Sequence, residues 1–202
     1  MNKVSAIERF LKNWVEPKNN ELDVILSKFY EKDKTTIIAG FIESLETICR
    51  KTVEMQYDQG TEDICYISYS TLAIDFLNKG PLYLIEVFGD NWFFSESLCE
   101  SAYEPKWLTS QLFEFYDHAM DEHMKYGGVI HPTEVEKTFL TVVDIQTKRF
   151  AKFLKENVKL EDIEAISAIG QMKKGRLLIT MGSYRGLFDE IYERKPLELR
   201  LR

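Results

Sequence analysis

Cysteine, glycine and proline are all scarce in this 202-residue chain. The three cysteines, Cys49, Cys65 and Cys99, are odd in number, widely spaced and without a C-x-x-C pair. Disulfide scaffolds and zinc sites need denser and more regular spacing, so we interpret these residues as buried thiols. Ten glycines and five prolines are too few for a fibrous or disordered chain.

Long apolar runs and catalytic motifs are also missing. No stretch reaches the roughly 18 apolar residues of a transmembrane helix, and the N-terminus lacks the apolar core of a signal peptide. P-loop, dinucleotide-binding, H-E-x-x-H and G-x-S-x-G patterns do not occur. We therefore expect a soluble cytoplasmic protein that is not an enzyme and has no cofactor, no metal and no catalytic residues.

Helical periodicity opens the chain. Apolar residues recur at helical spacing from Ile7 to Trp14, and we expect Pro17 to end that helix. A second helical pattern starts at Leu22 and runs to about residue 59, with the polar run Lys32–Thr35 expected to divide it. These patterns predict N-terminal helices over residues 1–60.

The composition then changes to one typical of strands. Residues 64–77 are rich in Ile, Tyr, Thr and Ser, residues 82–88 follow a turn, and residues 91–94 suit a short third strand. The connections are too short for parallel crossovers, which predicts an antiparallel meander over residues 62–95. Asp75 and Glu86 are expected on the solvent face of these strands, and a carboxylate pair is the less favoured alternative.

Helical spacing returns over residues 105–170, and Gly127-Gly128 marks the end of one helix there. Two apolar runs around Arg185-Gly186 predict a C-terminal hairpin over residues 175–195. This order predicts a single α+β domain over residues 1–202. We expect it to be predominantly helical, with a small, mostly antiparallel sheet of about five strands.

Negative charge is concentrated in the middle of the chain. The formal net charge is −7, and residues 86–122 contain nine acidic residues against Lys106 alone, a net −8. The C-terminal part from Gln171 carries a net +4. The acidic excess argues against nucleic-acid binding, because neutralising phosphates needs clustered Lys and Arg.

Aromatic residues interleave with these acids from Phe88 to Tyr116. Aromatic anchors among carboxylates suit a surface that binds a basic protein, since the rings supply desolvated contact and the charge accelerates encounter. The alternative is that the aromatics belong to the core and the acids form an ordinary solvated face.

A second cluster suggests metal chemistry. Residues 117–122 place His118 near Asp117, Asp121 and Glu122 on one helix, and such a set can hold a divalent cation. His123 lies too far around the helix to chelate the same ion as His118. A half-buried His123 and an exposed His118 are the simpler interpretation, and a metal-dependent hydrolase is the alternative function.

The segment Gly89-Asp90-Asn91-Trp92-Phe93-Phe94, followed by Cys99, Tyr103 and Trp107, carries a family resemblance. It resembles small bacterial proteins of the polymorphic-toxin immunity type. In those, a Ser/Thr-rich strand and an Asn-Trp-aromatic strand precede a helix with spaced Trp. The resemblance implies a bacterial antitoxin and transfers no active-site residues.

Together these patterns favour an immunity protein that occludes a basic toxin domain through an acidic, aromatic surface. The hypothesis takes the contact residues to be Asp90, Trp92, Glu96, Glu100, Glu104 and Asp121. We expect a basic protein as partner, no nucleic acid, no membrane, and a monomer or weak homodimer. A structural or regulatory homodimer is the remaining alternative.

Overall fold

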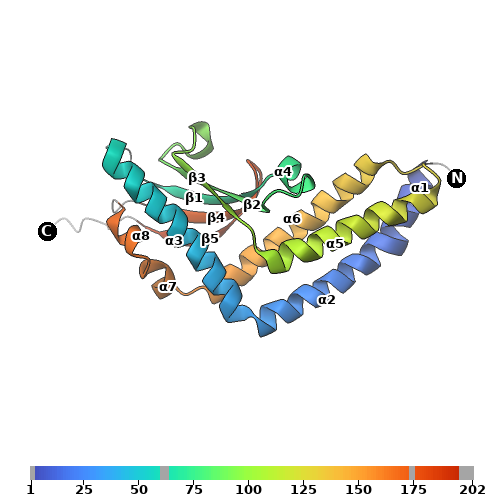
Figure 1. Ribbon diagram of the computed structural model, residues 1–202, viewed down its shortest axis with the longest axis horizontal. Helices are drawn as coiled ribbons and strands as arrows, with labels where there is room; N and C mark the ends of the chain where they lie inside the picture. Colours follow the sequence, from blue (N-terminus) through green and yellow to red (C-terminus); the bar gives the residue numbers. More distant parts are fainter. Residues whose placement is uncertain (1–2, 60–63, 173–175, 196–202) are drawn as a thin grey trace. The chain divides into compact units, whose positions relative to one another are not determined.

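A computed structural model describes residues 3–59, 64–172 and 176–195, without the side chains of residues 58, 59, 74 and 75. The fold is α+β and predominantly helical, with one five-stranded sheet (Figure 1). The chain divides into two compact units, Met1–Lys34 with Pro105–Gln146 (unit 1) and Thr35–Glu104 with Thr147–Arg202 (unit 2). The single domain over residues 1–202 stays a prediction.

Unit 1 is built from helices. They are α1 (Lys3–Phe10), the π-helical turn η1 (Leu11–Val15), α2 (Glu16–Lys32), α5 (Lys106–His123), the 3₁₀ turn η3 (Met124–Tyr126) and the first part of α6 (Pro132–Asn157). Helix α2 packs against α5. Trp14 links α1 to α5, because its ring stacks on Phe10 of α1 at 5.6 Å and contacts Phe115 of α5 at 5.4 Å. The predicted end of α5 is confirmed, with Gly127 left-handed at φ 61°.

The prediction that Pro17 ends the first helix is wrong. The chain stays helical from Lys3 to Lys32 because the wider turn η1 precedes Pro17 and starts a new α segment. Pro17 then lies in the first turn of α2, where a missing backbone N–H costs no hydrogen bond. The predicted division at residues 32–35 is confirmed, since α2 ends at Lys32 and α3 (Lys34–Gln59) follows Asp33.

Unit 2 holds the sheet. Its strands are β1 (Tyr66–Thr71), β2 (Tyr83–Phe88), β3 (Cys99–Tyr103), β4 (Leu177–Ser183) and β5 (Phe188–Arg194), in the order β3-β2-β1-β4-β5. The β3-β2-β1 meander and the β4-β5 hairpin are antiparallel, and β1 pairs with β4 in parallel. The predicted C-terminal hairpin is therefore confirmed, except that Lys173–Gly175 lie outside the described residues.

Two details of the predicted meander are wrong. Residues 91–94 form the 3₁₀ turn η2 (Trp92–Phe94) rather than a strand, and the third strand is β3, so the meander ends at residue 103. The first strand also stops at Thr71, and Asp75 lies in the short helix α4 (Ala73–Leu77). The last part of the helical region predicted over residues 105–170 consists of two short helices, α7 (Leu160–Glu164) and α8 (Ser167–Gln171).

One face of the sheet packs against helices. Tyr69 is fully buried there, with its ring 5.2 Å from Phe41 and its hydroxyl 3.0 Å from Ser44 Oγ, both on α3. Tyr83 contacts the later part of α6, with its ring 6.2 Å from Phe150 and its hydroxyl 3.2 Å from Thr147 Oγ1. This face therefore carries the main core of unit 2, and the loop over residues 89–98 packs on the opposite face.

No helix among the described residues combines the length and apolar character needed to cross a bilayer.

Candidate functional site

The loop over residues 89–98, between β2 and β3, folds back over the second face of the sheet (Figure 1). Its Trp92 ring stacks on Tyr66 of β1 at 4.7 Å and 1°, and the indole Nε1–H donates to Ser68 Oγ at 3.1 Å. Phe93 extends the contact to Phe188 of β5 at 5.3 Å. Aromatic packing on side chains of β1 and β5 therefore holds this loop in one conformation.

Trp92 adopts a backbone conformation that large side chains avoid. Its φ is 46°, in the left-handed region, where a Cβ atom costs roughly 1–2 kcal/mol. The stack on Tyr66 and the hydrogen bond to Ser68 offset that cost, so the side-chain contacts determine the backbone here. Such strained positions concentrate at functional sites.

Exposed acids lie along the same loop and the strand after it. We name as the acidic loop–strand segment the residues Asp90, Trp92, Phe94, Glu96, Glu100 and Glu104. Its four carboxylates are all exposed, and Phe94 is fully exposed. Five of the six predicted contact residues belong to this segment in unit 2, whereas Asp121 is exposed on α5 of unit 1.

The carboxylates of the segment are held by neutral donors. Asp90 Oδ1 accepts a hydrogen bond from Cys65 Sγ at 2.7 Å, and Glu100 accepts one from the Ser97 hydroxyl. Lys51 Nζ donates to the backbone carbonyl of Glu100 at 3.1 Å. Within the described part of the chain, no carboxylate of the segment forms an ion pair with Lys or Arg. Their charge therefore remains available to an external cation.

Glu86 lies beneath this segment, and the expectation that it faces solvent is wrong. It is 4% exposed, because its strand β2 is interior and the loop over residues 89–98 covers the face that carries it. Across the strands it stands opposite Ser68 on β1 and Glu100 on β3. Burial raises the pKa of Glu86, the Glu100 carboxylate raises it further, and the positive charge of Arg185 opposes both.

Three hydroxyl residues lie with Glu86 on this face of the sheet, and we call the four residues Ser68, Ser70, Glu86 and Thr180 the buried polar layer. Thr180 Oγ1 on β4 donates to Ser68 Oγ at 3.1 Å, and Ser68 also accepts from Trp92. Ser70 Oγ and Glu86 Oε2 are buried without a hydrogen-bond partner. Buried polar atoms normally have partners, so these two atoms mark the layer as incomplete. Sequence reasoning missed Ser68, Ser70 and Thr180, which read as ordinary strand residues.

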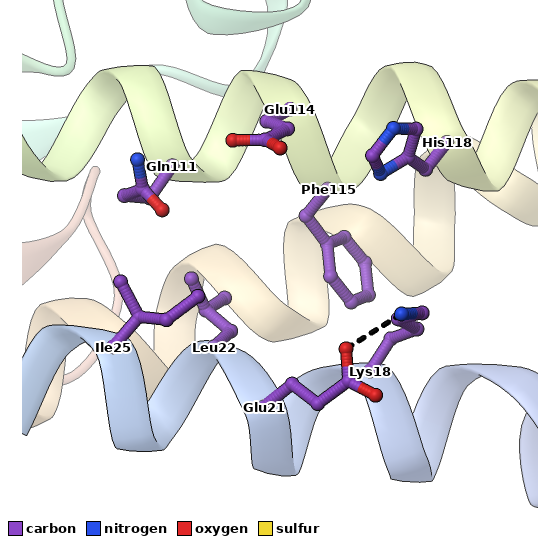
Figure 2. Close-up of a pocket in the computed structure, with 8 residues that line it drawn as sticks. All are labelled: Lys18, Glu21, Leu22, Ile25, Gln111, Glu114, Phe115 and His118. Atoms are coloured by element: carbon purple, nitrogen blue, oxygen red, sulfur yellow. Dashed lines mark hydrogen bonds and ion pairs between the residues drawn. The ribbon is translucent and has the colours of Figure 1, made fainter.

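The metal cluster of the alternative hypothesis does not form among the described residues. His118 is exposed, and with Glu114 it lines a pocket between α5 and α2 whose other wall includes Lys18 and Glu21 (Figure 2). Lys18 forms an exposed ion pair with Glu21 at 2.5 Å. Among the described residues, no group of three or more His, Cys, Asp or Glu side chains is arranged to hold a metal ion.

His123 behaves as the simpler interpretation predicted. It is half-buried, and its Nδ1 contacts the backbone carbonyl of Met120 one turn earlier on α5. That contact leaves His123 apart from His118, in keeping with their angular separation on the helix.

Comparison with known proteins gives no relative for this chain: no family model matches it, nor does any curated protein or solved structure. The function is therefore argued from the geometry above.

Proposed function

We propose that this protein binds a basic protein partner through the acidic loop–strand segment, and that it acts as an immunity protein toward a basic toxin domain. The observation that carries the proposal is the set of exposed carboxylates that form no ion pair with any described residue, beside a fully exposed Phe94 and an anchored Trp92.

The negative charge accelerates association with a basic partner. Exposed carboxylates that form no ion pair among the described residues keep a negative field toward solvent. Such a field can raise association rates from about 10⁵–10⁶ to about 10⁸–10⁹ M⁻¹s⁻¹ at low salt. Toxin domains that act on nucleic acids need basic substrate-facing surfaces, so an acidic segment would cover the surface that their activity requires.

The aromatics supply the contact. Tryptophan is strongly enriched among residues that dominate binding energy, and rigid rings lose little conformational entropy on association. Trp92 is already fixed by Tyr66 and Ser68, and the neighbouring Phe94 presents its whole ring to solvent. A partner therefore meets a preorganised anchor rather than a mobile loop.

The test uses the basic protein encoded by the gene adjacent to this one, which an immunity protein requires. Co-expression of the wild-type chain should restore growth of cells that the neighbour kills. The double variant Glu96→Lys/Glu100→Lys should lose that protection. The matched control Glu43→Lys/Glu54→Lys makes the same charge change at exposed positions of α3, the helix that packs on the opposite face of the sheet.

The control variant should protect as the wild type does. Equal protection by both double variants would contradict the proposed surface. Absence of any adjacent gene for a basic protein, or failure of the wild type to protect, would contradict the immunity function.

A further inference from the structure

The buried polar layer of unit 2 continues across the strands to the edge of the sheet. Ser70, Glu86 and Glu100 come from the successive strands β1, β2 and β3 and point to the same face, as the register shows. Glu86 and Glu100 are directly opposite, which places their Cβ atoms about 5 Å apart. Glu86 and Glu100 are therefore adjacent carboxyl groups, and Ser70, which stands opposite Leu84, is the diagonal neighbour of Glu86 on the same face.

Two polar atoms of this layer lack a hydrogen-bond partner. Ser68 Oγ accepts hydrogen bonds from Thr180 and Trp92, whereas Glu86 Oε2 and Ser70 Oγ are buried and have no partner among the described residues. A buried polar atom left unpaired destabilises the folded state, and more so when it is charged. The chain retains Glu86 at a position where it lowers stability, as is typical of binding and catalytic groups.

Access comes from the β3 side. Exposure increases from Ser70, fully buried on β1, through Glu86, 4% exposed on β2, to Glu100 and Ala102, both exposed on the edge strand β3. Ala102 is small and leaves room above the edge. A long side chain that crosses β3 meets the Glu100 carboxylate first and the Glu86 carboxylate next.

We infer that Glu86, Glu100 and Ser70 form a receptor for one guanidinium group, supplied by an arginine side chain of the basic partner. The inference rests on the proposed function and names the chemistry of its central contact. Guanidinium carries five N–H donors in a planar fork, which suits two facing carboxylates and a hydroxyl oxygen better than the single charge of an ammonium group.

The chain's own arginine does not occupy this receptor. Arg185 acts on Glu86 through its charge, but its guanidinium lies over the Tyr184 ring, 5.4 Å from the centroid. In the described part of the chain it forms neither a hydrogen bond nor an ion pair with the Glu86 carboxylate. The unsatisfied oxygen of Glu86 therefore has no donor among the described residues.

The experiment titrates the full chain with N-acetyl-arginine amide and, in parallel, with N-acetyl-citrulline amide, which has nearly the same shape and no charge. NMR follows the Glu86 side-chain carboxyl carbon and the indole N–H of Trp92, assigned with Trp92→Phe. We expect saturable shifts with the arginine probe, and binding at least about tenfold weaker with the citrulline probe. Glu86→Gln should weaken arginine binding by a similar factor, and Glu43→Gln, at an exposed position of α3 on the opposite face of the sheet, should leave it unchanged.

Equal binding of the two probes would overturn the inference, as would arginine shifts that persist in Glu86→Gln. If Glu86→Gln folds poorly, the wild-type titration of the Glu86 carboxyl carbon decides, because bound guanidinium must move its midpoint to lower pH and an unmoved midpoint contradicts the receptor. The probes are small molecules, so their result is independent of growth protection. Probe binding without growth protection would support the receptor and reject the immunity function. Growth protection without probe binding would support the immunity function and reject the receptor.

Discussion

Replacing Glu86 by Gln should make the protein more stable at neutral pH. The raised pKa of Glu86 means that the folded state holds the carboxyl proton more tightly than the unfolded chain does. The stability that this proton contributes is complete below the ordinary pKa of 4.5 and is lost as pH rises through the folded value. Gln has nearly the same shape and is neutral at every pH, so it removes that loss.

The magnitude follows from the surroundings of the carboxylate. Its Oε2 is buried without a partner, which costs about 1–3 kcal/mol, and the charge of Arg185 offsets part of this. We expect a gain of about 1 kcal/mol at pH 7, equivalent to about 2–4 °C in Tm for a chain of this size.

Urea unfolding of wild type and Glu86→Gln from pH 4 to pH 8 measures this gain. The difference in unfolding free energy should be near zero at pH 4 and grow as pH rises. Glu96→Gln, at an exposed position, should stay within about 0.5 kcal/mol of wild type throughout. A Glu86→Gln protein that is less stable at pH 7, or a difference that does not change with pH, would refute the reasoning.

Three further predictions concern the loop, the hairpin and a buried thiol. By urea unfolding, Trp92→Gly should be more stable than Trp92→Ala by about 1 kcal/mol, because only glycine accepts φ 46° without strain; equal unfolding free energies would contradict that strain. Gly182→Ala should cost about 1–3 kcal/mol by thermal unfolding, since its Cβ would lie 2.1 Å from the Leu187 carbonyl oxygen; wild-type stability would show that the hairpin yields freely. Burial raises the pKa of the Cys49 thiol to about 12, so at pH 8 iodoacetamide should label Cys49 on the order of a thousandfold more slowly than half-buried Cys99; similar rates by mass spectrometry would contradict this burial.

Periodicity predicted most of the elements because it records which face of each element is buried. The helix end at Gly127 and the break within residues 32–35 follow from local patterns, and both are confirmed. Pro17 could not be interpreted correctly, because the π-helical turn that accommodates it leaves no mark in the apolar spacing. Residues 91–94 have strand composition, yet the packing of Trp92 on Tyr66 and Phe93 on Phe188 makes them a turn.

The candidate site, too, could be predicted from the sequence only in part. Charge counting identified the acids of residues 90–104, because net charge is a property of the sequence. It could not place Glu86, since burial there depends on a loop that folds back over the sheet from further along the chain. An acid in an interior strand, next to a Ser-rich strand, is the signal that sequence reasoning could have used.

The salt dependence of association tests the central claim most directly. Stopped-flow mixing with the neighbour-encoded basic protein should give a wild-type association rate that falls steeply above about 0.1 M salt, where the Debye length is about 10 Å. Glu96→Lys/Glu100→Lys should associate at least about tenfold more slowly at low salt and depend less on salt, whereas Glu43→Lys/Glu54→Lys should remain close to wild type. A wild-type rate that does not respond to salt, or equal slowing by the two double variants, would contradict binding through the acidic loop–strand segment.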